Sequence, residues 1–288
     1  MKATHRVAFC FIFFVNDIGL CASFIGMNIK EYVAERKAEI RSIIATKDHV
    51  PSLCIISVGG NPASEAYIKG KKKDSAEVGF NAVHIALKEE TTQTELDALI
   101  IEKNNDPSID GILVQLPLPK HLSPERVNEL ISPAKDVDGF VPNSRFVCCT
   151  PKGIVDYLAH EGFPFVGKNA VVLGRSQIVG KPMAKLLLDR SCNVTVLHSK
   201  TSEEDKRFYL KHADLIVVAV GRCGVIDSSY ELKPSAFVVD VGINRDEEGH
   251  LHGDCEPNLP VALQTPVPGG VGLLTRLALL DNLLEAAK

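Results

Sequence analysis

The chain has 288 residues, a length that suits two domains of ordinary size better than one core. Its composition, 45% hydrophobic and 24% charged with 21 Gly and 16 Pro, is that of a globular protein and excludes collagen-like, disordered and coiled-coil classes. The formal net charge of −4 and the absence of Trp argue against nucleic-acid binding and a polybasic membrane contact, so we expect a small-molecule partner.

Residues 1–21 have the features of a targeting segment. Lys2 and Arg6 precede an apolar run over 7–15, and the segment ends in small residues. The run is shorter than the roughly 20 residues of a membrane span, so no membrane association is expected. A presequence, an ordinary buried segment and a misassigned start codon remain open. We therefore predict a cytoplasmic protein, with a mitochondrial or other compartment as the alternative if residues 1–21 direct targeting.

From about residue 22 onward, short apolar β-branched runs alternate with segments of helical pattern. This alternation predicts an α/β fold, with parallel sheets covered by helices. In the first half, strands are expected over 53–58 and 111–115, and helices over 29–46, 62–78, 94–104 and 124–130. The Pro117-Leu118-Pro119 stretch ends the second of these strands.

The second half has a regular order of strands and helices. Helices are expected over 152–160, 179–190 and 202–211, strands over 170–173, 194–197, 215–219 and 237–241, and a closing helix over 272–287. The βαβαβ run within this series is typical of a Rossmann-type dinucleotide-binding domain. We therefore predict a catalytic domain over 22–145, a cofactor domain over 146–271, and a last helix over 272–288 that packs back on the first domain.

The cysteines and histidines give no metal signal. Eight cysteines are scattered without a Cys-x2-Cys pair, and His250-Leu251-His252 lies in a Gly- and Asp-rich turn. Reduced, mostly buried thiols and a solvated hairpin are the expected outcome, and no metal is assigned.

A glycine-containing loop follows the strand over 170–173. It reads Gly174-Arg175-Ser176-Gln177-Ile178-Val179-Gly180 and leads into a helix. Glycine at the strand exit permits a tight turn, amides at the helix start hold phosphate, and Gly180 lets helix and strand approach closely. The spacing departs from Gly-x-Gly-x2-Gly, so a plain β-α turn remains the alternative.

The end of the next strand indicates which dinucleotide binds. An NAD enzyme usually places an acidic residue about 20 residues beyond the glycines. Here His198, Ser199 and Lys200 follow the strand, and no carboxylate occurs before Glu203. Arg175 and Ser199 offer donors to a ribose 2′-phosphate, which favours NADP over NAD. A solvated basic loop is the alternative.

A helix over 62–78 carries a candidate catalytic group. Tyr67 and Lys71 are four residues apart and share one face, and Ser64 lies one turn earlier. Because Lys72 and Lys73 follow directly, a solvated lysine face is the alternative interpretation.

Several separated motifs occur in one order along the chain. They are Pro62-Ala63-Ser64 with Tyr67-x3-Lys71-x-Lys73, Gly111-Ile112-Leu113-Val114-Gln115-Leu116-Pro117-Leu118-Pro119, Lys135-Asp136-Val137-Asp138-Gly139, Gly174-Arg175-Ser176-x2-Val179-Gly180-x-Pro182, Asp240-Val241-Gly242-Ile243-Asn244 and Thr265-Pro266-Val267-Pro268-Gly269-Gly270-Val271-Gly272. From about residue 22 to the C-terminus, this set closely resembles the bifunctional methylenetetrahydrofolate dehydrogenase/methenyltetrahydrofolate cyclohydrolase family.

The resemblance implies an NADP-dependent homodimer of one-carbon folate metabolism, a supplier of purine biosynthesis, with folate bound in a cleft between two domains. Such an enzyme oxidises 5,10-methylenetetrahydrofolate and hydrolyses the methenyl product to 10-formyltetrahydrofolate. The catalytic residues it implies are Lys71, Tyr67, Gln115 and Asp138. The substrate-binding residues are Ser64, Tyr67, Gln115, Leu116, Asp138, Pro268, Gly269 and Gly270. The cofactor-binding residues are Thr150, Gly174, Arg175, Ser176, Ile178, Val179, Ser199, Gly221 and Ile243.

These implied roles agree with the chemistry. Water attacking the methenyl carbon must lose a proton, which a neutral lysine accepts. Gln115 orients Lys71 and the water without adding charge, and Asp138 accepts hydrogen bonds from the pterin edge. For Thr150, contact with the cofactor and N-capping of the following helix are both compatible with the sequence.

The chain also departs from the resemblance. The stretch between Gly139 and Cys149 is about nine residues shorter than usual, Leu273 and Leu274 replace a common Pro-Met, and Arg276 is an unexpected charge on the last helix. A catalytically impaired folate/NADP-binding relative and a dehydrogenase with weak cyclohydrolase activity are therefore alternatives. An NADP-dependent oxidoreductase acting on another substrate class is a third.

Overall fold

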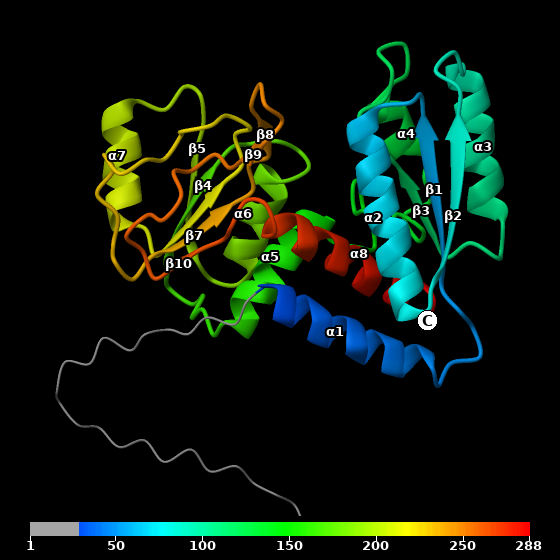
Figure 1. The fold of residues 1–288 in the computed structure, drawn as a ribbon, viewed down its shortest axis with the longest axis horizontal. Coiled ribbons are helices and arrows are strands. Elements are labelled where there is room, and N and C mark those ends of the chain that lie inside the picture. Colours follow the sequence, from blue (N-terminus) through cyan, green and yellow to red (C-terminus); the bar gives the residue numbers. More distant parts are fainter. Residues whose placement is uncertain (1–28) are drawn as a thin grey trace, which may run out of the picture.

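The structure is a computed structural model that describes residues 29–288, so the predicted targeting segment over 1–21 lies outside the described residues. Two parallel sheets stand side by side, and the last helix, α8 (Val271–Ala286), runs between them (Figure 1). Helix α1 (Ile29–Ile44) lies alongside α8. Among the described residues, no helix is long and apolar enough to cross a membrane. The predicted α/β fold is confirmed.

The first sheet has the strand order β2-β1-β3, and all its strands are parallel. Its strands are β1 (Ser52–Val58), β2 (Asn81–Leu87) and β3 (Gly111–Val114), and its helices are α2 (Pro62–Val78), α3 (Gln93–Asn105) and α4 (Pro124–Leu130). Strand β1 is buried along its whole length, as its continuous apolar sequence predicts. Strand β2 was not predicted, because it is an edge strand whose exposed and half-buried positions interrupt the apolar run.

The second sheet has the order β10-β7-β6-β4-β5, again all parallel. Its strands are β4 (Asn169–Leu173), β5 (Asn193–Leu197), β6 (Leu215–Val218), β7 (Phe237–Asp240) and β10 (Leu263–Gln264), and its helices are α5 (Cys149–His160), α6 (Gly180–Asp189) and α7 (Glu203–His212). Chain order reverses beside β4, the point at which doubly wound sheets bind ligands outside the carboxyl ends of their strands. The predicted hairpin is present as the antiparallel pair β8 (Asn244–Arg245) and β9 (Leu251–His252).

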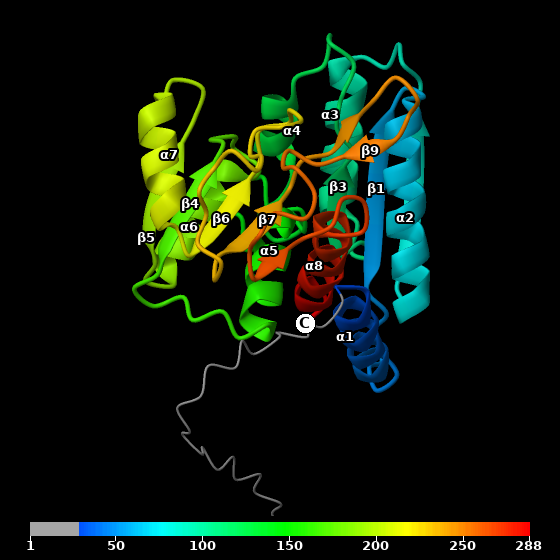
Figure 2. The same ribbon diagram turned by 60° about the vertical axis from the view of Figure 1, so that its left-hand side comes forward.

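Helix α8 joins the two halves of the molecule (Figure 2). Leu277 and Leu280 are buried in one core with Ile40 of α1 and Leu53 of β1, and the same core includes Tyr157 of α5. Further along the helix, the Asn282 side chain donates to the carbonyls of Val137 (2.9 Å) and Val147 (3.0 Å). The last helix therefore completes a core that begins with the first helix.

The short connection over 139–149 forms a tight loop whose two ends are in contact. Gly139 has φ +77°, and a β-carbon there would lie 2.5 Å from the backbone nitrogen of Cys148. The Cys149 amide donates to the Asp138 carbonyl (3.2 Å), and the Cys148 thiol donates to the Gly139 carbonyl (2.8 Å). The loop thus brings the first turn of α5 directly against Asp138.

Candidate active site between the two sheets

A cavity of about 520 Å³ lies where α2, the loop after β3, the first turns of α8 and the loop after β7 meet. It brings together every predicted substrate-binding and catalytic residue: Ser64, Tyr67, Lys71, Gln115, Leu116, Asp138, Pro268, Gly269 and Gly270. Three predicted cofactor residues also line it, namely Thr150, Ile178 and Ile243. Residues from both halves of the sequence therefore share one cavity.

Lys71 and Gln115 form a hydrogen-bonded pair in the wall of this cavity. The Lys71 Nζ atom donates to Gln115 Oε1 at 3.0 Å, and Gln115 Nε2 donates to the Leu116 carbonyl at 2.8 Å. The Gln115 amide also continues the first sheet by donating to Ile56 O (2.8 Å). Both ends of the Gln115 side-chain amide are therefore held, and its oxygen in turn fixes the amine of Lys71. Lys71 is only 9% exposed, so this amine lies in a largely apolar surrounding.

Tyr67 and Ser64 extend the same helix face. Tyr67 is 40% exposed and lines the cavity one turn before Lys71. Burial raises the pKa of its phenol above the usual value, so the ring is neutral at physiological pH. Ser64 is buried, and its hydroxyl donates to Leu116 O at 3.4 Å. Tyr67 therefore offers a neutral aromatic surface, while Ser64 holds α2 against the loop after β3.

Asp138 presents a carboxyl group beside the start of α5. Its neighbour Cys149 is buried, with its thiol donating to Val137 O at 3.2 Å. Burial, and then the charge of Asp138, raise the pKa of the Cys149 thiol well above its ordinary value. Cys149 is thus a neutral packing group, and Asp138 is the hydrogen-bond acceptor on this side of the cavity.

The loop after β4 has the steric features predicted for it. A β-carbon at Gly174, which has φ +118°, would lie 2.3 Å from the Ala219 carbonyl oxygen, and one at Gly180 would lie 2.3 Å from the Gly174 carbonyl oxygen. Ser176 Oγ accepts from the amides of Val179 (3.2 Å) and Gly180 (3.3 Å). The loop therefore packs tightly against β6 while its outer residues stay exposed to a ligand.

The loop after β5 lies next to it. The Gly174 amide donates to Leu197 O at 2.9 Å, so the two strand ends are neighbours. Ser199 and Lys200 are exposed, and the four residues after β5 include no carboxylate. With the exposed guanidinium of Arg175, this edge fits a ribose carrying a 2′-phosphate better than a bare 2′-hydroxyl.

The remaining predicted cofactor residues do not line the cavity but follow the carboxyl edge of the second sheet. They are Gly174, Arg175, Ser176, Val179, Ser199 and Gly221. The N-cap interpretation of Thr150 is wrong, because Cys148 occupies that position and Thr150 lies within the first turn of α5. The Thr150 hydroxyl instead pairs with Thr275 Oγ1 at 3.0 Å, which links α5 to α8.

Two buried carboxylates at the cofactor edge received no role from the sequence, although Asp240 lies in one of the quoted motifs. Asp254, fully buried, accepts from the amides of Val220 (2.7 Å), Gly221 (2.9 Å) and Arg222 (2.9 Å). Asp240 accepts from the amide of Asp254 itself (2.9 Å), and burial raises the pKa of Asp240 above its usual value. No local pattern distinguishes such acids from surface ones, since their partners come from three separate segments.

Arg276 is a further cavity residue to which the sequence assigned no role. It was noted there only as an unexpected charge, and its side chain reaches the cavity from the second turn of α8. Val241 and Gly242, from the loop after β7, also line the cavity. They belong to the motif over 240–244, but no role was predicted for them.

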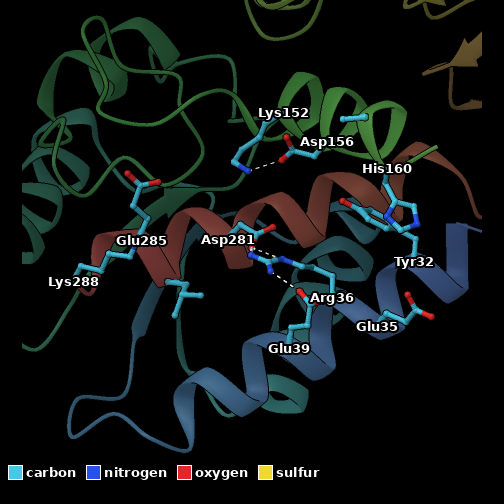
Figure 3. A pocket seen from close by; sticks show the side chains of 12 residues that line it. Tyr32, Glu35, Arg36, Glu39, Lys152, Asp156, His160, Asp281, Glu285 and Lys288 are labelled. Atoms are coloured by element: carbon cyan, nitrogen blue, oxygen red, sulfur yellow. Dashed lines mark hydrogen bonds and ion pairs between the residues drawn. The ribbon is translucent and has the colours of Figure 1, made fainter. Parts of the chain in front are cut away.

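A second hollow lies between α1, α5 and α8 (Figure 3). Arg36 points to Asp281 and Glu39, with nitrogen–oxygen distances of 2.8 Å and 2.6 Å. Lys152 similarly reaches Asp156 at 2.6 Å. The Arg36–Asp281 pair joins α1 to α8 and supports the packing of these two helices, whereas the other two pairs lie within α1 and within α5.

A doubly wound dinucleotide-binding sheet, facing a lysine-bearing cavity on a second α/β sheet, defines a two-domain enzyme that uses a nicotinamide dinucleotide. Comparison with known families gives a matching result. The profile "Tetrahydrofolate dehydrogenase/cyclohydrolase, catalytic domain" matches residues 25–138, and its "NAD(P)-binding domain" counterpart matches residues 148–288. The chain belongs to the tetrahydrofolate dehydrogenase/cyclohydrolase family.

Individual relatives agree with this assignment. The "Bifunctional protein FolD" of Acetivibrio thermocellus is 45% identical over 277 residues, covering 91% of this chain and 96% of the relative. A crystal structure of the bifunctional FolD enzyme from Campylobacter jejuni has 40% identity and a TM-score of 0.85, covering 90% of this chain and 96% of that one. The Trypanosoma brucei enzyme, solved with NADP and an inhibitor, has 31% identity and a TM-score of 0.84, covering 91% and 96%.

Proposed function

We propose that the protein oxidises 5,10-methylenetetrahydrofolate with NADP and then hydrolyses the methenyl product to 10-formyltetrahydrofolate, in one-carbon folate metabolism. The observation that carries this proposal is the Lys71–Gln115 pair in a cavity that both halves of the chain share. A single site for both steps suits the chemistry, because the product of the first step is the substrate of the second.

The cavity has the groups needed to orient a tetrahydrofolate. The carboxylate of Asp138 accepts hydrogen bonds from the amino and N–H edge of the pterin. Tyr67 offers an aromatic face along the substrate, and Gly269 and Gly270 add no side chains, which leaves room for a flat ring. Holding the ring in one orientation presents its reactive carbon to the cofactor side of the cavity.

The first step requires little acid or base from the protein. When bound, NADP supplies the hydride acceptor, and the oxidised carbon is stabilised by the two nitrogens that flank it. The residues that fit the dinucleotide are Arg175 and Ser199 at its phosphorylated ribose, and Thr150, Ile178 and Ile243 where the cofactor edge meets the cavity.

The second step requires a base. Water attacks the cationic methenyl carbon and forms a carbon–oxygen bond, and the proton it loses passes to the amine of Lys71 acting as the base. Gln115 fixes that amine through its Oε1 atom and adds no charge that would compete with the cation. The bond between that carbon and N5 then breaks, the remaining hydroxyl proton is transferred to N5, and the carbon stays on N10 as the formyl group of the product.

Replacing Lys71 with methionine tests this assignment. Lys71→Met keeps an unbranched side chain as far as its Cε atom and removes the base, so we expect cyclohydrolase turnover to fall by about 10²-fold or more, the usual scale for a general base. Dehydrogenase turnover should fall much less. The measurement is a coupled assay that follows NADPH formation and then methenyl decay.

The control is Lys73→Met, which removes an exposed lysine from the same helix. Near-normal hydrolysis by Lys71→Met would refute the role of Lys71 as base. Failure of the wild-type chain to reduce NADP with methylenetetrahydrofolate would favour the impaired, ligand-binding alternative.

The proposal also covers the oligomeric state, the domain bounds and the cellular compartment. We propose a homodimer, supported by the family resemblance and testable by sedimentation equilibrium. The catalytic domain is assigned to residues 22–145 and the cofactor domain to residues 146–271. The compartment is proposed as cytoplasmic, with targeting by residues 1–21 as the alternative, which imaging of full-length and shortened fusion proteins distinguishes.

A further inference from the structure

Arg276 places a second cation in the proposed folate cavity. It lies in the second turn of α8, and 27% of its side chain is exposed. The proposed chemistry uses Lys71 and leaves Arg276 without a role. A guanidinium in the wall of a mainly apolar cavity is costly to desolvate unless something compensates it.

The surrounding helices hold this guanidinium in one position. Arg276 Nε lies 2.6 Å from Oδ2 of Asp74, a buried residue of α2, and Asp74 Oδ1 accepts from Lys37 Nζ of α1 at 2.7 Å. Gly70 leaves space for the guanidinium of Arg276, because a β-carbon at position 70 would lie 2.5 Å from Arg276 Nη1. Asp74 thus anchors the Nε side, while the terminal nitrogens lie beside Gly70, one residue before Lys71.

The charges of the cavity are arranged with opposite signs on different sides. Asp138 lies against the start of α5, where its carbonyl accepts from the Cys149 amide at 3.2 Å. Arg276 instead lies against α2, beside Gly70 and Asp74. A ligand that passes Lys71 therefore meets an acceptor of hydrogen bonds on one side and a cation on the other.

A tetrahydrofolate has matching polarity, with a donor-rich pterin edge at one end and the carboxylates of its glutamate at the other. We propose that Arg276 is a specificity-determining residue that binds a glutamate carboxylate of the substrate through its terminal nitrogens. This inference rests on the proposed function. A planar guanidinium fixed through Nε is preorganised to donate to a carboxylate, which a flexible lysine is not.

The test compares two substrates that differ only at the tail: 5,10-methenyltetrahydrofolate and 5,10-methenyltetrahydropteroate, which lacks the glutamate. We expect Arg276→Leu to raise KM for the folate at least about tenfold, the usual scale for a hydrogen bond to a charged group. KM for the pteroate, kcat for both substrates and KM for NADP should stay within about twofold of wild type. Lys73→Leu, which removes an exposed cation from α2, should change none of these values.

Equal rises in KM for both substrates, or a fall in kcat for both, would overturn the proposal and assign Arg276 to packing. If Arg276→Leu does not fold, Arg276→Lys replaces it, since that variant retains the charge facing Asp74. For Arg276→Lys, the ratio of KM for the pteroate to KM for the folate should shrink several-fold relative to wild type. An unchanged ratio would overturn the proposal. If the wild-type chain hydrolyses neither substrate, the proposed function itself fails, which is a separate outcome.

Discussion

Arg175 is an exposed residue at the start of the cofactor loop. Its proposed contribution to binding is a contact with the ribose 2′-phosphate, which NADP has and NAD lacks. Gly174 and Gly180 fix the loop beside the end of β5, so Arg175 lies on the edge that Ser199 follows and does not line the catalytic cavity. Its expected contribution is therefore to the choice of dinucleotide and not to the chemistry.

We predict that Arg175→Ala weakens NADP binding about tenfold or more while changing NAD binding little, because it removes a charge-assisted contact to the 2′-phosphate alone. Titration calorimetry with both dinucleotides measures the difference. Lys185→Ala, which removes an exposed cation from α6 outside this edge, is the matched variant for a nonspecific loss of positive charge. Equal weakening for NAD and NADP would contradict the assignment.

At the scale of residues, the sequence predicted best those site residues whose chemically active side chain lies within a short motif. Lys71, Gln115 and Asp138 each lie in such a motif, and the cavity contains all three. Asp254 and Arg276 were not interpreted in this way, because their meaning depends on partners from other segments. A buried acid and a cavity cation are properties of packing, and no spacing within one segment encodes them.

At the scale of elements, the carboxyl ends of β6 and β7 are held together by the pair Asp240 and Asp254. Asp254 Oδ1 also accepts from Asn244 Nδ2 (2.9 Å), so one carboxylate joins the loop after β6 to the start of β8. Gly221, a predicted cofactor residue, lies in the first of these loops. Asp254 is therefore expected to position the cofactor edge without touching the reacting atoms.

We predict that Asp254→Asn raises KM for NADP several-fold and lowers the free energy of unfolding by about 1–3 kcal/mol, because an amide nitrogen would face backbone donors. Hydrolysis of methenyltetrahydrofolate requires no cofactor, so its rate should stay near that of the wild type. The two assays, with thermal melting, separate these effects. Asp189→Asn, at an exposed i,i+4 pair, is the control; an unchanged KM for NADP would show that the loop does not depend on Asp254.

The elements that the sequence did not predict share a physical cause. Strand β2 forms an edge, so its residues alternate in exposure and include Asn81 and His84. Strand β10 has only two residues and is fixed by pairing with β7. In contrast, the buried strands β1, β4, β6 and β7 have continuous apolar sequences, and each was placed to within one residue.

At the scale of the whole molecule, α8 holds the two sheets in one unit and thereby fixes the cavity between them. Six of its leucines are buried in the core that also includes residues of α1, β1 and α5: Leu274, Leu277, Leu279, Leu280, Leu283 and Leu284. Burying a leucine side chain contributes roughly 1.5–3 kcal/mol, so together they amount to on the order of 10 kcal/mol. That is comparable to the roughly 5–15 kcal/mol that stabilises a typical domain.

We predict that a chain ending at residue 270 loses the cooperative unfolding transition of its first domain, since the core around Leu53 is left open. Circular dichroism melting curves of the shortened and complete chains measure this loss. A chain ending at residue 286 retains all of α8 and serves as the control. A transition in the shorter chain with unchanged midpoint and amplitude would show that the first domain folds without α8.

The same helix sets an order of events during synthesis. Residues 29–138 leave the ribosome long before α8 does, so the nascent first domain must wait for more than a hundred further residues before its core is complete. During that interval the apolar face around α1 is open to solvent and to chaperones. Two other cores lie wholly before α8 and are able to form earlier: the one between the first sheet and helices α3 and α4, and the one that contains Ile216 of β6 in the second sheet. Although the first domain is translated first, its core around Leu53 is completed only by the last helix of the chain.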